Sequence, residues 1–377
     1  GYQISQYKYP LVSGGELNSI KITRIHLEED TGTSLHSEPT TNNQQPTSLV
    51  NFNRAGVPLM ELVTEPVIHS AKEAADFARE WQLLLRYLGV SDGNMEKGEM
   101  RVEANISVSG SDLLGTKVEI KNLNSFKVVE RAIEYEIKRQ GEILEKGEKV
   151  VQETRGWDDK KGETFSQRQK EESHDYRYFP EPDIPKLKLG ELAEFDVEQL
   201  KKELPELPWA KRQRYAKTFG VKLSDIEIFV QDKKQADFFE VTAKILADKK
   251  LIQLAANYIV NDGVESAISP ATFAELIVMI GKGELSSRGA KNVLAIMLKG
   301  DEKVPTEIAA KLGLIQKNDE ADLEKIVKKV IDNNPKVVAE YKTGKTAALE
   351  FLVGQGMKIS KGSANPIALR KLLMKHP

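Results

Sequence analysis

The sequence contains no cysteine, carries no strong net charge and has no long apolar run. The lack of cysteine excludes disulfides, thiolate zinc sites and cysteine nucleophiles, and it fits a reducing compartment. The net charge of −2 excludes a global basic field, so any RNA-binding site must be a local patch. No apolar stretch approaches the ~20 residues of a membrane span, and no signal peptide is present, so we expect no role at a membrane.

Several catalytic signatures are also missing. The histidines have no HExxH spacing, and no G-x-S-x-G occurs. The stretch Thr343–Thr346 reads TGKT, like the end of a phosphate-binding P-loop, but Ala339 stands where that motif needs its first glycine. A turn between helices is the favoured interpretation of this stretch.

The 377 residues are 40% hydrophobic and 30% charged, which is enough for a sizeable core and for two or three domains. Up to residue 203 the pattern mixes strands and helices, and it predicts an α+β domain with a mixed or antiparallel sheet. Beyond residue 203 only helical spacing occurs, with about seven helical segments. We predict domains over 1–203, 204–310 and 311–377, the last two being helical.

Four strands and two helices are predicted in the first domain. The strands are expected over 20–27, 56–63, 100–108 and 115–121. One helix is expected over 70–88, with Ser70 and Glu73 as a capping box, and another over 125–139, with Ser125 as N-cap. A flexible polar loop is predicted over 37–46, and an extended surface segment over 175–185. The apolar stripes expected to be buried are Phe77, Trp81, Leu84, Leu85 and Leu88 on the first helix and Val129, Ile133 and Ile137 on the second.

Residues 25–30 read IHLEED and place three acids at the end of the first strand. Alternation puts Glu29 on the face of Ile25 and Leu27, which we expect to be the inward face. A buried carboxylate requires a cation or hydrogen-bond donors. Taken alone, however, this stretch favours a solvated turn made of Glu28, Glu29 and Asp30.

The third and fourth predicted strands each have one polar face. Two such faces are typical of antiparallel strands with one side in water, but they could also line a common cleft. In the second case Glu29, Glu103 and Glu119 would offer the hard oxygen ligands that Mg²⁺ takes. The cations that could contact phosphate are Arg54, Arg101, Lys117 and Lys121. Glu61, a lone acid in an apolar strand, is a weaker candidate because an edge position explains it equally well.

Read together, several long motifs resemble one family. These are IHLEEDTG, NRAGVPLMELVTEP, NMEKGEMRVEANIS, GTKVEIKNLNSF, QETRGWD, DYRYFPEPDIP, LPELP and FLVGQGMKISKGSANP. In this order they are similar to the B subunit of the glutamine-dependent aspartyl/glutamyl-tRNA amidotransferase, and the resemblance runs over nearly the whole chain.

The resemblance implies an ATP-dependent ligase that forms a carbon–nitrogen bond with glutamine as amide donor. It implies a heterotrimer in which an amidase A subunit releases ammonia from glutamine and a small C subunit ties A to B. It implies that B binds Glu-tRNA(Gln) or Asp-tRNA(Asn) and phosphorylates the side-chain carboxylate with ATP and Mg²⁺, before ammonia displaces phosphate. The implied fold is a catalytic cradle followed by helical and tail domains that bind tRNA, and the expected location is cytoplasmic and bacterial in type.

By position in the motifs, Glu29 and Glu119 match the metal-binding glutamates of the family and are our predicted catalytic residues. Glu28, Glu61 and Glu103 are predicted to lie near the metal. The family's first strand, which carries a glutamate and a histidine that help to bind the metal, has no counterpart here. Since the sequence also begins with Gly1 rather than Met, we expect it to be truncated at its N-terminus. An alternative is therefore a tRNA-binding scaffold subunit without kinase chemistry.

Overall fold

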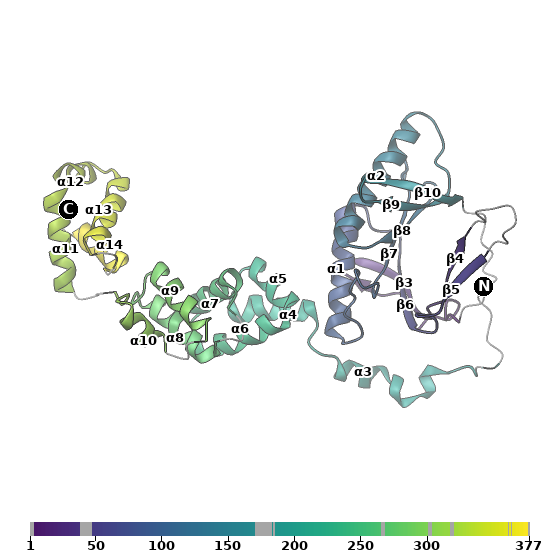
Figure 1. The fold of residues 1–377 in the computed structure, drawn as a ribbon, viewed down its shortest axis with the longest axis horizontal. Coiled ribbons are helices and arrows are strands. Elements are labelled where there is room, and N and C mark those ends of the chain that lie inside the picture. The colour runs from purple at the N-terminus through teal and green to yellow at the C-terminus, as the bar shows by residue number, and fades with distance from the viewer. Residues whose placement is uncertain are drawn as a thin grey trace. The chain divides into compact units, whose positions relative to one another are not determined.

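The structure is a computed structural model that describes residues 4–37, 47–169, 183, 185–264, 268–300, 304–316, 320–360, 362 and 364–375. The chain divides into two compact units, Gly1–Leu207 and Pro208–Pro377. The predicted α+β region followed by a helical region is therefore confirmed (Figure 1). The predicted loop over 37–46, apart from Ser37, and the predicted extended segment over 175–185, apart from Asp183 and Pro185, lie outside the described residues.

The first sheet of the N-terminal unit is built around one long strand. Strand β3 (Ile20–Glu29) pairs antiparallel with β1 (Val12–Ser13), β2 (Glu16–Leu17) and β6 (Pro58–Thr64). In the register of β3 and β6, His26 stands opposite Glu61 and Glu29 opposite Pro58. Strands β4 (Thr33–Ser37) and β5 (Thr47–Asn51) pair antiparallel in a separate two-stranded sheet.

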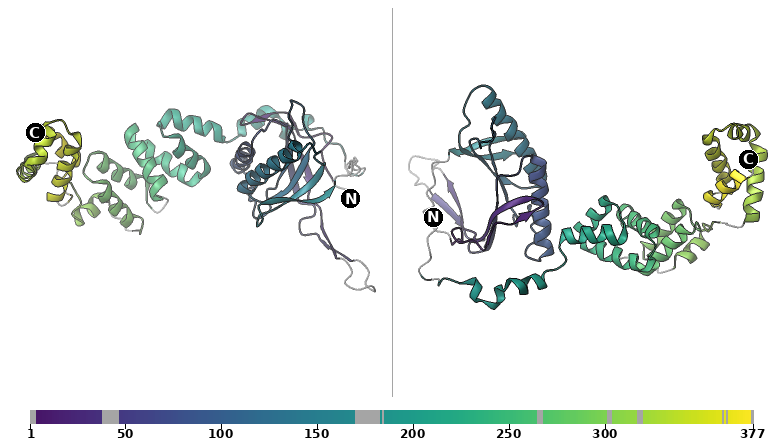
Figure 2. Two further views of the ribbon diagram at one scale, coloured as in Figure 1. Left: turned by 90° about the horizontal axis from the view of Figure 1, so that it is seen from above. Right: turned by 180° about the vertical axis from the view of Figure 1, so that it is seen from behind.

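The second sheet has the order β10-β9-β8-β7, and it is mixed. Strands β7 (Val102–Ile106) and β8 (Val118–Leu123) are antiparallel, as are β9 (Glu153–Asp158) and β10 (Glu163–Gln169). Strands β8 and β9 are parallel, because helix α2 (Phe126–Glu145) carries the chain from one to the other. Ile106 and Ile120 of the sheet pack against Val129 and Ile133 of α2, so α2 covers one face of this sheet (Figure 2).

Both predicted helices form, although one buried stripe differs from the prediction. Helix α1 (Ala71–Tyr87) begins at Ser70, whose Oγ accepts from the backbone N–H of Glu73, and α2 begins at Ser125. Of the predicted stripe of α1, Leu85 is buried, Phe77, Trp81 and Leu84 are half-buried and Leu88 is exposed, because the helix buries mainly its small residues and packs against α2. On α2, Val129 and Ile133 are buried as predicted, but Ile137 is exposed. The buried residues of α1 are Ala71, Ala75, Ala78, Glu80, Leu83 and Leu85.

A buried charge network, here called the α2 network, joins α2 to the sheet. It consists of Glu136 and Arg139 from α2 and Glu153 and Arg155 from β9. Glu136 Oε1 accepts from Arg139 Nη2 at 2.6 Å, and its Oε2 lies 3.6 Å from Arg155 Nε. Thr164 of β10 donates to Glu136 and accepts from Arg155. The motif QETRGWD therefore packs α2 onto the sheet.

The rest of the described chain is helical. The N-terminal unit ends with short helices, and the C-terminal unit holds eleven α-helices among its described residues, more than the seven predicted, because short loops split several apolar runs. Helices η1 (Leu189–Glu191), η2 (Ala193–Phe195) and α3 (Val197–Glu203) close the first unit. The second unit contains α4 (Pro208–Arg214), the π-turn η3 (Tyr215–Phe219), α5 (Leu223–Gln231), α6 (Lys233–Leu246), α7 (Lys249–Asp262), α8 (Pro270–Gly281), α9 (Ser287–Met297), α10 (Pro305–Lys311), α11 (Glu320–Asn333), α12 (Pro335–Lys342), α13 (Thr346–Ile359) and α14 (Pro366–Lys375).

The C-terminal unit contains two hydrophobic groups. Four aromatic rings from η3, α5 and α6 pack together, with Phe229 and Phe239 stacked at 4.4 Å between ring centroids. Helices α11–α14 bury a separate apolar cluster that includes Leu323, Leu352 and Leu369. The proposed division of this unit near residue 310 stays a prediction. In the described parts of the chain, no helix combines the length and the apolar character needed to cross a membrane.

Candidate active site

Strand β3 presents His26 and Glu28 on its buried face. His26 is 0% exposed and Leu27 is 39% exposed, so the inward face follows Ile20 and Ile22 rather than Leu27. The prediction that Glu29 shares the inward face is therefore wrong. Glu29 lies on the other face, where its Oε1 accepts from the backbone N–H of Ile4 at 3.2 Å.

His26, Glu28 and Glu61 form a compact group, here called the β3–β6 cluster. His26 Nε2 lies 3.0 Å from Glu28 Oε1, and Ser5 Oγ donates to the same oxygen at 3.1 Å. One ligand atom from each of the three cluster residues lies within 4.8 Å of the others, a spacing that could hold a metal ion. Nδ1 of His26 is buried and has no hydrogen-bond partner among the described residues.

Glu61 is held in an unfavourable electrostatic setting. Glu61 is exposed to solvent, yet partial desolvation by the surrounding atoms raises its pKa above the ordinary value, and the charge of Glu28 raises it further. His26 and Arg24 act in the opposite direction but do not cancel the rise. A cation bound between Glu28 and Glu61 would relieve this repulsion. The predicted edge position of Glu61 also fits the structure, since Glu61 is exposed and β6 pairs with β3 alone among the described strands.

A second group of carboxylates lies on β7 and β8. Lys121 Nζ donates to both oxygens of Glu103, at 3.0 and 3.1 Å, and lies 3.8 Å from Glu119 Oε1. Glu119 is buried and accepts from Thr154 Oγ1 at 3.0 Å. Asn122 has a left-handed φ of 62° beside a register shift between β7 and β8. Such a bulge re-aims nearby side chains, and here Lys121 bridges the two acids.

The two groups share an electrostatic environment, since the charge of Glu103 also raises the pKa of Glu61. Lys121 contacts both acids of the second group, whereas the charges that act on Glu61 in the first group are Glu28 and Glu103 in one direction and His26 and Arg24 in the other. Lys117, just before β8, is exposed. Its predicted contact with phosphate stays a prediction.

Arg54 and Arg101 meet at Asp30, a residue to which the sequence assigned only a turn. Arg54 Nε lies 2.8 Å and Arg101 Nη2 3.5 Å from Asp30 Oδ2. Arg54 Nη1 also donates to the carbonyl of Gly98 at 3.0 Å. The arginines come from the turn before β6 and the residue before β7, so no local sequence signal links them to Asp30.

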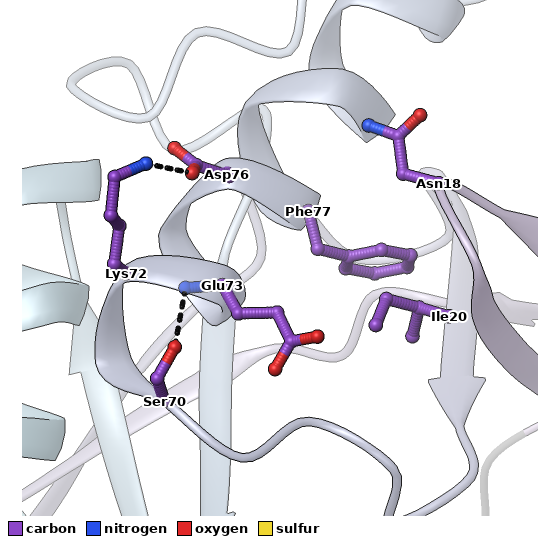
Figure 3. Close-up of a pocket in the computed structure, with 7 residues that line it drawn as sticks. All are labelled: Asn18, Ile20, Ser70, Lys72, Glu73, Asp76 and Phe77. Atoms are coloured by element: carbon purple, nitrogen blue, oxygen red, sulfur yellow. Dashed lines mark hydrogen bonds and ion pairs between the residues drawn. The ribbon is translucent and has the colours of Figure 1, made fainter.

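Two surface pockets lie away from these groups. The first has a volume of about 270 Å³ and surrounds the start of α1, where Phe77 faces Ile20 and where Asp76 accepts from Lys72 (Figure 3). The second, of about 330 Å³, lies between the loop 108–116 and the end of α2. No residue lining either pocket belongs to the candidate site, so the carboxylates and not the pockets indicate the chemistry.

Comparison with known proteins accounts for both units. Residues 1–193 match the GatB/GatE catalytic domain and residues 237–376 match the GatB domain. Similar proteins include aspartyl/glutamyl-tRNA(Asn/Gln) amidotransferase B subunits of Thermodesulfovibrio yellowstonii (43% identity, 100% of this chain, 81% of the relative), Persephonella marina (43%, 99% and 80%) and Coxiella burnetii (44%, 100% and 81%). The similarity covers the whole chain and most of each relative, so the chain belongs to the family of aspartyl/glutamyl-tRNA(Asn/Gln) amidotransferase B subunits.

Proposed function

We propose that this chain activates the side-chain carboxylate of Glu-tRNA(Gln) or Asp-tRNA(Asn) with ATP and amidates it with ammonia derived from glutamine. The products are Gln-tRNA(Gln) and Asn-tRNA(Asn), and the reaction is that of a ligase that forms carbon–nitrogen bonds. The observation that carries the proposal is the full-length similarity to amidotransferase B subunits, together with acids and cations gathered on two neighbouring sheets.

The chemistry requires two balanced steps. A carboxylate oxygen of the aminoacyl group attacks the γ-phosphorus of ATP, and ADP leaves. Ammonia then attacks the acyl carbon, inorganic phosphate leaves and the amide nitrogen loses a proton. The protein contributes mainly positioning and charge neutralisation to phosphoryl transfer, and Lys121, Arg54 and Arg101 are suited to that role.

The β3–β6 cluster fits a divalent cation. Its carboxylates are the hard ligands that Mg²⁺ takes, and the pKa of Glu61 is raised by desolvation and by the charge of Glu28, which His26 and Arg24 offset only in part. Because the Nε2–H of His26 donates to Glu28, the buried Nδ1 of a neutral ring would accept a hydrogen bond from water or from a ligand at this site. When bound, Mg²⁺ would neutralise charge on the phosphates of ATP. In this proposal Glu28 and Glu61 hold the cation, while the predicted metal contacts of Glu29, Glu103 and Glu119 stay predictions.

The proposed partners follow from the family. We place the chain in a heterotrimer with an amidase A subunit and a small C subunit, in the cytoplasm, where aminoacyl-tRNA is made and used. The C-terminal helical unit would bind tRNA, which gives this half of the chain a role in selecting the substrate.

Transamidation of Glu-tRNA(Gln) by the reconstituted full-length complex tests the proposal. We expect Glu28→Gln, Glu61→Gln and Glu119→Gln each to lower kcat about 10²-fold or more while glutaminase activity survives. Glu29→Gln distinguishes the two assignments of the metal site. A full loss of transamidation would support Glu29 as the metal ligand predicted from the sequence, and near-normal activity would support the β3–β6 cluster. Glu142→Gln on the exposed surface of α2 is the matched control.

Two results would overturn the proposal. One is ATP-dependent turnover that survives in all four site variants. The other is a wild-type complex that binds Glu-tRNA(Gln) but neither consumes ATP nor forms Gln-tRNA(Gln), which would favour the scaffold alternative.

A further inference from the structure

We infer that Asp30 is a positioning residue that holds Arg54 and Arg101 as one clasp for a phosphate group. The role of the clasp in the reaction rests on the proposed function. The contacts that form the clasp do not depend on which residues bind the metal. The clasp joins three segments: the end of β3, the turn before β6 and the start of β7.

The backbone of Asp30 is fixed against the turn that carries Arg54. The Asp30 N–H donates to the carbonyl of Val57 at 2.8 Å, and its own carbonyl accepts from the N–H of Gly56 at 2.9 Å. Within the turn, the N–H of Val57 donates to the carbonyl of Arg54. Asp30 and Arg54 are therefore held together by backbone bonds before their side chains meet.

The side chains are arranged to present donors outward. The carboxylate of Asp30 is 12% exposed, whereas the side chains of Arg54 and Arg101 are 41% and 56% exposed. Asp30 contacts Nε of Arg54 and Nη2 of Arg101, so both guanidiniums keep N–H groups that Asp30 does not engage. Arginine offers a planar fork suited to phosphate oxygens, and a fork fixed in advance loses less conformational freedom on binding.

Gly98 provides the second support of Arg54. Its carbonyl accepts from Arg54 Nη1, and its φ of +71° is one that residues with a side chain rarely adopt. A Cβ at this position would lie 3.0 Å from the same nitrogen. The lack of a side chain at Gly98 thus leaves space for the guanidinium of Arg54, which Asp30 and the Gly98 carbonyl hold from two sides.

The charges of the clasp make the inference testable. Two arginines and one aspartate give a formal charge of +1, and removing the aspartate charge would raise it to +2. If charge alone governed phosphate binding, Asp30→Asn would bind an anion more tightly. If Asp30 positions the guanidiniums, the same substitution weakens binding although the site becomes more positive.

The first experiment titrates inorganic tripolyphosphate into the full-length complex by calorimetry. We expect Asp30→Asn and Arg54→Lys each to weaken binding about tenfold, and Asp30→Glu to recover part of the loss. The control is Asp76→Asn, because Asp76 also joins two cations, Lys72 and Arg79, but lies on the exposed surface of α1. Unchanged or tighter binding in Asp30→Asn overturns the inference.

The second experiment identifies the source of the phosphate. In the same variants the KM for ATP and the KM for Glu-tRNA are measured separately, with thermal unfolding as a check on folding. A rise confined to the KM for ATP assigns the clasp to the nucleotide, and a rise confined to the KM for tRNA assigns it to an RNA phosphate. Unchanged KM values for both overturn the clasp.

The two proposals fail in different ways. A wild-type complex without tRNA-dependent ATP use would contradict the proposed function, while the tripolyphosphate titration would still decide the clasp. If Asp30→Asn does not fold, Asp30→Glu and Arg54→Lys carry the test, since each keeps the charge of the residue that it replaces.

Discussion

The N-terminal unit contains two groups of carboxylates that are built in opposite ways. The acids of the α2 network are buried, whereas in the β3–β6 cluster Glu28 is half-buried and Glu61 is exposed. In the α2 network Glu136 and Glu153 meet Arg139 and Arg155, and the hydrogen bonds include Thr164 and Gln140. In the β3–β6 cluster Glu28 and Glu61 meet each other and one histidine. The first group has arginines in direct contact with its acids. In the second group the pKa of Glu61 is raised by desolvation and by the charge of Glu28, and His26 and Arg24 offset this rise only in part.

This difference separates acids that stabilise the fold from acids that are available for a ligand. Buried charges with matched partners need no further cation, and they hold α2 in register with the sheet. Like charges held close together cost stability, and such sites occur where a ligand or a reaction requires them. The carboxylates under α2 are accordingly poor candidates for metal binding, although as residue types they equal Glu28 and Glu61.

The largest expected effect comes from breaking the α2 network. Arg155→Met would leave Glu136 and Glu153 without one of their cations, and we expect a loss of about 3–5 kcal/mol in the free energy of unfolding. Urea denaturation followed by circular dichroism measures the change. Arg79→Met is the control, since it loses an exposed ion pair with Asp76 and should cost less than about 1 kcal/mol. Equal losses in the two variants would show that the α2 network stabilises the fold no more than an exposed ion pair does.

An intermediate effect is expected from a cation at the β3–β6 cluster. A metal that binds only the folded chain stabilises it by about 2.7 kcal/mol at a hundred times its Kd. We expect Mg²⁺ or Mn²⁺ to raise the unfolding temperature of the wild type, and Glu61→Gln to lose most of that rise. Without metal, Glu61→Gln should be slightly more stable than the wild type because the repulsion with Glu28 is gone.

Differential scanning calorimetry with and without the metal tests this prediction. Glu142→Gln, an exposed change on α2, should keep the full response to metal. The same metal-induced shift in Glu61→Gln as in the wild type would show that the cation binds elsewhere.

The sequence predicted the elements of the first unit well, but it did not predict which face of β3 is buried. Apolar residues occur on both faces of that strand, with Ile20 and Ile22 on one and Ile25 and Leu27 on the other. The half-polar strands β7 and β8 also allow two arrangements, with the polar face either in water or in a cleft. Only the packing of the whole unit therefore determines which face of each strand is buried. His26 follows the parity of Ile20 and Ile22, a signal in the sequence that could have identified the buried face.

Sequence patterns could not predict the clasp at Asp30, for a different reason. Its three side chains are 24 and 47 residues apart along the chain, at positions 30, 54 and 101, and they meet only because β3, β6 and β7 are brought together by folding. Motifs preserve residue types at short spacing, whereas this contact depends on two separate turns. The resemblance to the family predicted the chemistry of the unit but assigned Asp30 no role.

The smallest expected effect is the pH dependence of stability that Glu153 of the α2 network contributes. Burial tends to raise the pKa of Glu153, but hydrogen bonds from Ser166 and Arg155 outweigh it, and the pKa lies below its usual value of 4.5. The ionised form of Glu153 therefore contributes its full share to the stability of the folded state above pH 4.5. This contribution is lost as the pH falls through the pKa of Glu153 in the folded state. Ser166→Ala removes one of these bonds, so the loss of stability on acidification should become shallower. Urea midpoints between pH 7 and about 3 measure this slope, with Ser109→Ala as the control, and equal slopes in all three proteins would show that Glu153 does not contribute to acid sensitivity.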